Sequence, residues 1–474
     1  MTEKNLRRIK AKPSFTEGSL FKGIILFSLP LIASQILQVL FNISDVIIVG
    51  KGVANSTIPV GAVSSTSTLL TLFTGFMIGL GAGINVKTAQ YLGANKSDDV
   101  KKTVDTSLVI SVITGVVIFV ICFFLARPLL ELLKTKDELI DKAVLYFKIY
   151  SFGMPALAIF NYGNGVLSAA GDTKRPLIYL TVSGFMNVGL NLFFVLVCDL
   201  DVEGVGLASV ITQYISAIAV IIRLVRIKDV HRLNFKTFSL SGKKAGEVLI
   251  LGVPAGIQNC IFAIANIFIQ TGINEFPYKE VTGINTAQYA DTIIYNVMAA
   301  FYTACSTFMG QNYGAGKKDR VLKSYYISML YAFAFGLAMG AFCFFKGDIF
   351  LRLFDSDPDV IAAGMEKLKI VGFAFCLSAF MDNTIAASRG IGKSLIPTII
   401  VIIGSCVFRI VWIYTVFAHF KTITSLFLLY PVSWVITAIA EMAYFFVSFR
   451  KTKFTSPEQT APEQSSSEKV SADI

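Results

Sequence analysis

Long apolar stretches recur along the whole of this chain, and they limit its possible folds more than any other feature. The residues are 54% hydrophobic and 15% charged, whereas about a quarter of the residues in a soluble protein are charged. A helix needs about 20 mainly apolar residues to cross a bilayer. We therefore expect an all-α integral membrane protein. Its twelve predicted transmembrane helices lie at 23–49, 60–84, 104–126, 143–169, 176–198, 204–227, 246–273, 284–309, 324–346, 362–388, 395–417 and 424–449.

The segments between and around the apolar stretches predict the domain organisation. Residues 1–22 form a charged amino-terminal segment without an evident cleavable signal peptide, so the first helix is expected to stay in the mature protein. A basic linker, 228–245, separates six spans in 23–227 from six in 246–449. The polar tail, 450–474, is rich in Pro, Ser and Glu and is predicted to be disordered.

The net charge of +11 reflects membrane topology in this interpretation. Most of the 42 basic residues fall in connections on the same side of the membrane as the amino terminus. The positive-inside rule then places both termini in the cytoplasm of a multi-pass protein of the cell (inner) membrane. We expect no nucleic-acid partner. The seven cysteines are scattered without a CxxC pair and are expected to be small buried apolar residues.

The two halves of the chain resemble each other, which indicates a duplication. Pro30 and Asn42 match Pro254 and Asn266, with the same spacing in both halves. Because each half has six spans, the second half enters the membrane in the same direction as the first. This predicts two six-helix bundles related by a parallel internal repeat, a pattern typical of secondary transporters. The other aligned segments are 89–102 with 310–323, 138–149 with 359–370, and 169–174 with 388–393, at offsets from 221 to 219.

Helix 23–49 carries an unusual polar stripe that ends at the acidic residue Asp45. Ser34, Gln38, Asn42 and Asp45 share one helical face, and Gln35 borders it. Pro30 lies upstream and predicts a kink or discontinuity, because proline removes one helical hydrogen bond. A charge in a transmembrane helix costs at least about 2.5 kcal/mol near its centre. Asp45 is therefore either a carboxylate that binds H⁺ or Na⁺, or a structural residue wetted at the extracellular end.

An amide pair on helix 176–198 complements this stripe. Asn187 and Asn191 are one turn apart, and their oxygens are suited to accept a hydrogen bond from a protonated Asp45 or to ligate Na⁺. The alternative is that they join neighbouring helices, as intramembrane asparagines often do. Asn161 on helix 143–169 is a weaker candidate of the same kind.

The second half keeps polar residues but has no acid at the position equivalent to Asp45, which is Ile269. Asp382 and Arg409 form a candidate ion pair, because a lone buried arginine is too costly in a membrane. Glu441 is expected near the membrane interface. Polar candidates for lining the substrate cavity in this half are Asn259, Asn266, Gln288, Asp291, Tyr295, Asp382 and Arg409, beside Gln35, Gln38 and Asn161 of the first half.

Together the motifs resemble the multidrug and toxic compound extrusion (MATE) family of antiporters over residues 20–450. The resemblance rests on "SLPLIASQILQVLFNISDVIIVG", "GLGAGINVKTAQYLGANKSDDVKK", "LSAAGDTKRP", "FMGQNYGAGKKDRV" and "YPVSWVITA". It implies two lobes, alternating access, and export of drugs or metabolites driven by H⁺ or Na⁺ influx. It also implies a transporter rather than an enzyme, with no cofactor and no bound metal beyond a possible Na⁺ at Asp45.

The resemblance also implies roles for single residues. Pro30 and Asp45 match the kink proline and cation-linked aspartate of the DinF-like and archaeal branch. In archaeal members an Asn and an Asp complete the site, whereas this chain has Asn187 and Asn191. The NorM-like branch has an acid eleven residues before an Arg-Gly, where this chain has Ser378.

We therefore expect an efflux antiporter for small organic, cationic or amphipathic solutes that acts as a monomer in the lipid bilayer. One alternative is a lipid-linked precursor flippase of the same broad superfamily, which would favour more spans and a strongly basic cavity. A membrane-embedded enzyme is a further alternative, but the chain has two histidines and no HExxH motif.

Overall fold

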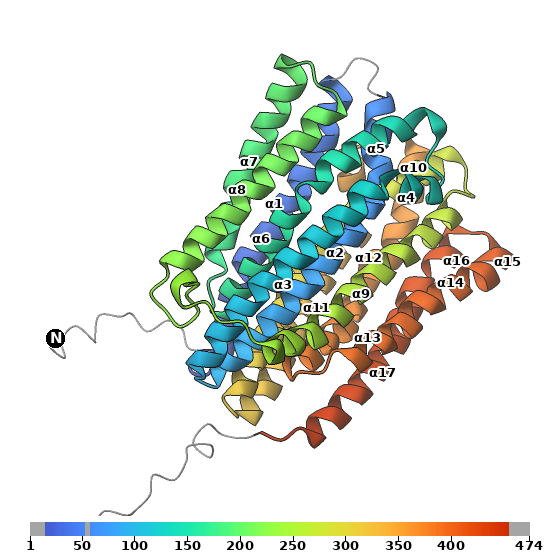
Figure 1. Ribbon diagram of the computed structural model, residues 1–474. Coiled ribbons are helices and arrows are strands. Elements are labelled where there is room, and N and C mark those ends of the chain that lie inside the picture. The colour runs from blue at the N-terminus through green and yellow to red at the C-terminus, as the bar shows by residue number, and fades with distance from the viewer. Residues whose placement is uncertain (1–14, 53–56, 455–474) are drawn as a thin grey trace, which may run out of the picture.

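The computed structural model describes residues 15–52 and 57–454, and it gives only the backbone at positions 42, 43, 45–52 and 57. These residues form a bundle of long helices (Figure 1). The tail predicted to be disordered lies outside the described residues beyond position 454.

The first half of the chain forms one group of helices, which we call the N-lobe. Its helix α7 continues into a short π-helical segment, η2 (Phe193–Val197). The helices are α1 (Leu20–Gly52), α2 (Thr57–Gly93), α3 (Ser97–Phe124), α4 (Ala126–Leu132), α5 (Asp137–Ser151), α6 (Met154–Ala169), α7 (Lys174–Leu192) and α8 (Val202–Arg226).

The second half forms the C-lobe. Two π-helical segments, η4 (Ile402–Val407) and η5 (Ile413–Phe417), join three short helices into one membrane span. The helices are α9 (Gly242–Ile273), α10 (Tyr278–Gly314), α11 (Lys318–Leu351), α12 (Pro358–Gly390), α13 (Leu395–Val401), α14 (Phe408–Trp412), α15 (Ala418–Phe420), α16 (Ile423–Phe427) and α17 (Leu429–Lys451).

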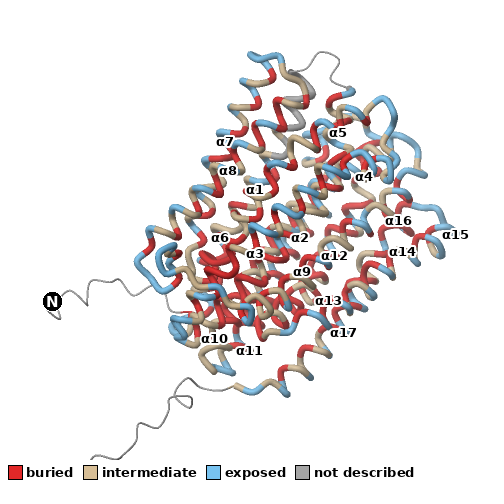
Figure 2. Tube along the Cα trace, in the orientation of Figure 1, coloured by how far each residue is buried: buried red, intermediate tan, exposed pale blue. Residues whose placement is uncertain are grey.

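The helices confirm the predicted all-α membrane architecture. Ten described segments are long and apolar enough to cross a bilayer, and α5 and α6, bent by 47°, together form an eleventh. The twelfth predicted span coincides with α12, which has 33 residues but carries Lys367, Asp382 and Arg389. Its length is ample for a crossing, and Lys367 is completely buried in the bundle. Figure 2 shows exposed positions along the outer helices. Many of the exposed residues are large and apolar, which suits contact with lipid.

Both ends of the described chain lie at the same end of the bundle. The backbone carbonyl of Phe15 accepts a hydrogen bond from Asn312, and the ring of Phe454 lies 5.7 Å from that of Tyr313. An even number of crossings accounts for this arrangement. We call this end the terminal side and the opposite end the far side.

The structure confirms the internal repeat and corrects one part of its alignment. Helices α2 and α10 both have 37 residues. Gly171 and Gly392 hold the same left-handed backbone, at φ of 85° and 86°. These two glycines are equivalent by an offset of 221, so the predicted match of 169–174 with 388–393 is wrong by two residues. The error arose because short turn motifs contain several glycines and align equally well in more than one register.

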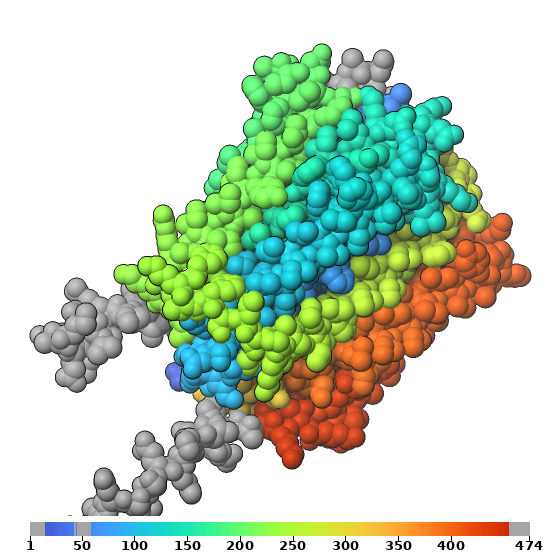
Figure 3. All heavy atoms as spheres, in the orientation of Figure 1, coloured from blue at the N-terminus to red at the C-terminus, as the bar shows by residue number. Residues whose placement is uncertain are grey.

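The lobes meet along a seam of close helix contacts. Glycines on α2 face α9 and α10, and a Cβ atom added to Gly79 would lie 2.3 Å from the backbone nitrogen of Gly256. Small residues let membrane helices approach closely in this way. Figure 3 shows α9 between the surface of α3–α5 on one side and α13–α17 on the other.

Candidate functional site

In the N-lobe, α1 packs against α7 at the level of the predicted coupling residues. The ring of Phe41 covers Gly184, where an added Cβ would lie 1.9 Å from a ring carbon. Four crossings separate the starts of α1 and α7, so the two helices run in the same direction. Helical position 45 therefore lies at about the height of Asn187. The α1 backbone and the amide pair therefore lie at a similar height in the bundle, and a coupling site shared between them stays a prediction.

The amide pair itself is buried. Asn191 donates a hydrogen bond to the side-chain oxygen of Asn187 at 3.2 Å, and the two residues are 0% and 7% exposed. Asn42 and Asp45 belong to α1, but their side chains lie outside the described residues. Their role in coupling stays a prediction.

The proline of α1 does not interrupt the helix, which runs continuously through Pro30. The Ser34 hydroxyl donates to the Pro30 carbonyl at 2.9 Å. Further along α1, Gln35 is half-buried and Gln38 is exposed. An exposed amide in the middle of a membrane helix is unfavourable against lipid, so Gln38 suits a wet surface between the lobes.

Other predicted cavity residues have different surroundings. Asn161 donates to the carbonyl of Leu157 in its own helix at 2.9 Å. Asn259 donates to the carbonyl of Gly75 at 2.8 Å, which joins the two lobes. Asn266 is exposed. Asn266 is the most exposed of these three residues, and Asn161 and Asn259 are half-buried.

The C-lobe contains a buried ion pair that sequence analysis did not predict. The Lys367 ammonium lies 2.9 Å from a carboxylate oxygen of Asp291, and it donates to Gln288 at 2.7 Å. The ring of Phe427 lies 5.2 Å from the same nitrogen. Lys367 is completely buried. Its position nine residues from the start of α12 made it look like an interfacial lysine, because its partners lie on distant helices.

Arg409 is buried among aromatic rings. Its guanidinium lies 4.6 Å from the ring of Tyr430 and 6.0 Å from that of Trp434, and its Nε donates to Ser433 at 3.2 Å. The predicted ion pair with Asp382 is wrong, because no described contact joins the two groups within 4.0 Å. They still interact electrostatically at longer range. Aromatic faces stabilise a cation, so Arg409 does not need a direct carboxylate partner.

A second group of charged residues in the C-lobe consists of Arg389, Asp382 and Glu441. Arg389 donates to the side-chain oxygen of Gln258 at 2.8 Å and interacts electrostatically with Asp382 and Glu441. Glu441 is 0% exposed, so the expectation that it is interfacial is wrong. Tyr295 is 46% exposed and lies near Asp382 and Arg389. It thus connects the interior charges to the surface of α10.

Pairs of polar contacts related by the repeat join the lobes on the terminal side. Gln90 donates to the carbonyl of Gly390 at 2.9 Å, and Gln311 donates to the carbonyl of Ala169 at 2.7 Å. The offset of 221 relates these two contacts. Among the described residues, the hydrogen bonds and ion pairs between the lobes lie in the terminal-side half or near the middle of the bundle. The lobes are therefore held together at this end.

An ion cluster reinforces the same end. The Lys244 ammonium of α9 lies 2.8 Å from Asp99 of α3 and 3.9 Å from the ring centre of Tyr91. Tyr91 also donates to Glu247. Lys244 is buried, so salt bridges and a cation–π contact both fix α9 to the N-lobe.

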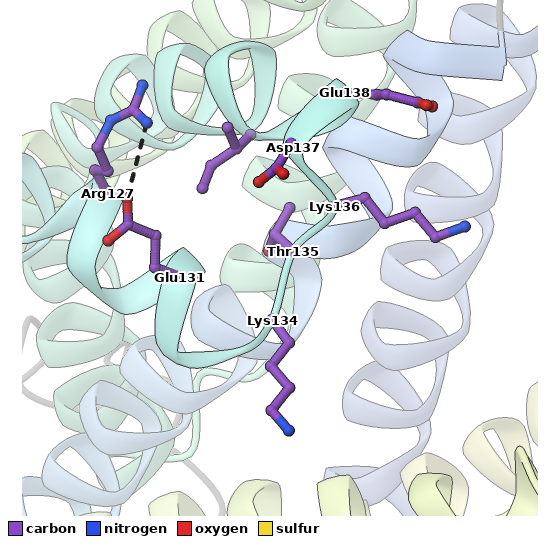
Figure 4. A pocket seen from close by; sticks show the side chains of 8 residues that line it. Arg127, Glu131, Lys134, Thr135, Lys136, Asp137 and Glu138 are labelled. Carbon is purple, nitrogen blue, oxygen red and sulfur yellow. Dashed lines mark ion pairs between the residues drawn. The ribbon is translucent and has the colours of Figure 1, made fainter.

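A surface hollow of about 680 Å³ lies at the turn between α4 and α5. Figure 4 shows charged side chains around it, with Arg127 paired to Glu131. Sites for drug-sized molecules are mainly apolar, and this hollow has both signs of charge and little enclosing structure. We do not assign it to substrate binding.

The MatE family model matches the chain over residues 30–193 and 254–415, which is more than half of its length. One matched segment lies within each lobe. The chain belongs to the MatE family. It is thus a transporter of the MATE type and not an enzyme.

Individual relatives agree with this assignment. The chain is 29% identical over 369 residues to the probable multidrug resistance protein YpnP of Bacillus subtilis, covering 76% of this chain and 80% of the relative. It is 24% identical over 399 residues to the probable multidrug resistance protein NorM of Thermotoga maritima, covering 81% and 82%.

Solved structures share the fold. One is a MOP superfamily transporter from Pyrococcus furiosus, with a TM-score of 0.86 and 21% identity over 94% of this chain and all of that one. Another is an outward-facing multidrug resistance MATE family transporter, with a TM-score of 0.85, 21% identity and the same coverage. These comparisons support twelve helices in two bundles. They do not support the alternative of a lipid-linked precursor flippase.

Proposed function

We propose that this MATE protein exports small organic, cationic or amphipathic solutes by alternating access, in exchange for H⁺ or Na⁺ that binds at Asp45. The observation that supports it most directly is the packing of α1 on α7, which puts helical position 45 at the height of the buried Asn187–Asn191 pair. The multidrug resistance proteins among its relatives supply the substrate class. Under this proposal both termini are cytoplasmic and the protein acts as a monomer.

The amide pair suits either coupling ion. A carboxylate held among apolar helices is costly when it is charged and has no partner. Binding of H⁺ removes the charge and leaves an O–H that an amide oxygen of Asn187 or Asn191 can accept. Binding of Na⁺ instead neutralises the charge, with carboxylate and amide oxygens as ligands. Asn42 is one turn from Asp45 on the same helix and extends this set of oxygens.

The path for substrate in this proposal is the surface between the lobes. Exposed polar side chains in the middle of helices face no favourable partner in lipid. Gln38 on α1, Asn266 on α9, and Gln288 and Tyr295 on α10 have this property. An aromatic ring such as Tyr295 can bind an organic cation through its face. Export requires that the terminal-side contacts open and reform as the lobes rock.

The test uses purified protein in liposomes and the organic cation ethidium, with Na⁺ and pH gradients applied separately. We expect one of the two gradients to drive ethidium movement in the wild type and Asp45→Asn to abolish it. Asp199→Asn is the matched control, because it removes an exposed carboxylate of the same lobe. Gradient-driven transport by Asp45→Asn at the wild-type rate would overturn the role of Asp45.

A further inference from the structure

Glu441 is a buried acidic residue of the C-lobe and is not part of the coupling site proposed in the N-lobe. It lies near the middle of α17, which spans Leu429–Lys451, and it is 0% exposed. Neither of its carboxylate oxygens has a hydrogen-bond partner among the described residues. Buried polar groups in proteins are nearly always hydrogen-bonded, so this carboxyl group needs an explanation.

The charged groups around Glu441 come from three helices. Arg389 and Asp382 of α12 are near enough to act on it electrostatically, but Arg389 forms no ion pair with it within 4.0 Å. Arg409 of α14 and Tyr295 of α10 in turn face Asp382. One turn before Glu441 on α17, the Thr437 hydroxyl lies 3.1 Å from the Ser405 hydroxyl of η4. Arg389 is therefore the only cationic neighbour that these contacts give Glu441.

Arg389 nevertheless bonds to a neutral group. Its Nη2 donates to the amide oxygen of Gln258 at 2.8 Å, and its Nε has no partner among the described residues. An arginine close to an ionised carboxylate in a dry interior forms a charge-assisted pair, which is stronger than a bond to an amide. Here Arg389 is hydrogen-bonded to Gln258, and Glu441 has no hydrogen bond. We expect this arrangement when Glu441 carries a proton and is therefore neutral.

We propose that Glu441 is a second proton-binding site, in the C-lobe, and that its occupancy decides whether Arg389 bonds to Gln258 or to the carboxylates of Glu441 and Asp382. When Glu441 releases its proton, the new carboxylate attracts Arg389 away from Gln258. When it takes a proton up, Arg389 returns to Gln258. The half-buried Asp382, beside the exposed Tyr295, gives the proton a route to the surface of α10.

This switch acts on the contact between the lobes. Gln258 is followed in α9 by Asn259, whose amide donates to the carbonyl of Gly75 in α2. Gln258 also lies within 3.4 Å of the Thr398 hydroxyl of α13. When Arg389 leaves or rejoins Gln258, the hydrogen bonding of α9 changes next to Asn259, which makes the contact with the N-lobe. The role of this switch in transport rests on the proposed function. Proton binding at Glu441 itself can be tested without a transport assay.

The experiment measures the infrared C=O band of protonated carboxyl groups in the purified protein as pH is raised. We expect a band in the wild type whose Glu441 component disappears on deprotonation, so that the band is smaller in Glu441→Gln than in the wild type and keeps its wild-type size in Asp105→Asn. Asp105 is the matched control because it is also buried but accepts a backbone hydrogen bond from Ser239 at 3.0 Å. A band of equal size in the wild type and in Glu441→Gln would overturn the proposal.

A second variant tests the role of Arg389 and does not alter any carboxyl group. Gln258→Ala removes the alternative partner, so Arg389 should stay with the carboxylates and the band should require a more acidic pH. An unchanged band in Gln258→Ala would overturn the switch. If the wild type moves no ethidium under any gradient, the proposed function fails, and the infrared titration still decides whether Glu441 binds a proton.

Discussion

The two lobes share a fold but not an interior. At an offset of 221, the buried C-lobe pair Asp291 and Lys367 corresponds to Leu70 and Tyr146 in the N-lobe, and Arg389 corresponds to Ser168. Some contacts at the seam, in contrast, are the same on both sides, among them the glutamines that each donate to a backbone carbonyl of the other lobe. After duplication, the seam kept its geometry because both lobes depend on it, whereas the interior of each lobe was free to acquire its own charges.

The largest expected effect comes from breaking the C-lobe ion pair. Lys367→Met leaves the Asp291 carboxylate buried without a cation, which should lower the stability by about 3–5 kcal/mol. Asp291→Leu combined with Lys367→Met gives the C-lobe the leucine that the N-lobe has, and most of the stability should return. Thermal unfolding of the detergent-solubilised protein measures both variants.

The control for this comparison is Lys369→Met, at an exposed position two residues away on α12. It should leave the unfolding temperature nearly unchanged. Equal losses in the single and the double variant would show that the pair is needed for more than charge compensation, and the lobes would then differ in their packing requirements as well.

The next largest loss of stability is expected from adding a methyl group at the seam, and it should be equal in both lobes. A Cβ at Gly93 would lie 1.9 Å from the carbonyl oxygen of Gln311, and one at Gly314 would lie 1.9 Å from that of Gln90. Gly93→Ala and Gly314→Ala should therefore each cost about 1–3 kcal/mol by overpacking the seam. Gly246→Ala is the control, because nothing lies within 4 Å of its added Cβ. Unequal losses in the two seam variants would contradict the equivalence of the lobes there.

Loss of the seam hydrogen bonds should have a smaller effect. Gln90→Ala and Gln311→Ala each remove one side-chain donor from a backbone carbonyl, at a cost of about 1 kcal/mol. Unfolding temperatures should fall equally in the two variants. Gln270→Ala, which removes a bond within the far-side end of α9, leaves the seam intact and serves as the control. A change in only one seam variant would show that the two contacts have diverged.

The smallest change in stability is expected from breaking the exposed ion pair between Lys279 and Asp357 of the C-lobe. A hydrogen bond from Lys279 lowers the pKa of Asp357 below its ordinary value. The pair therefore contributes to stability above the ordinary aspartate pKa, and the contribution disappears as pH falls through the lowered value. Lys279→Met should lower the unfolding temperature slightly at neutral pH and not at all in strong acid. A loss that persists in acid would contradict the ionic origin.

The sequence predicted the membrane fold well because the signals for it are local. Each apolar stretch is a property of consecutive residues, and the duplication is visible in short motifs such as those around Gln90 and Gln311.

The charged interior of the C-lobe was not predictable in the same way. Lys367 lies toward the start of an apolar stretch, where interfacial residues also lie, and Glu441 is a single acid in the last third of another. Their burial depends on which helices pack together, and the partners of Lys367 are about 80 residues away. The aromatic cage of Arg409 has the same origin, because Tyr430 and Trp434 belong to the next span.

The amino-terminal segment before α1 has a practical consequence. The ring of Phe15 is packed between Phe27 of the N-lobe and Phe308 of the C-lobe, and Arg320 donates to the carbonyls of Phe15, Glu17 and Gly18. Any movement that parts the lobes at this end must take Phe15 away from one of its neighbours. A fluorescent protein or affinity tag fused directly ahead of this segment would hinder the movement of Phe15 between the lobes. Carboxyl-terminal fusions are therefore the better choice for measuring activity.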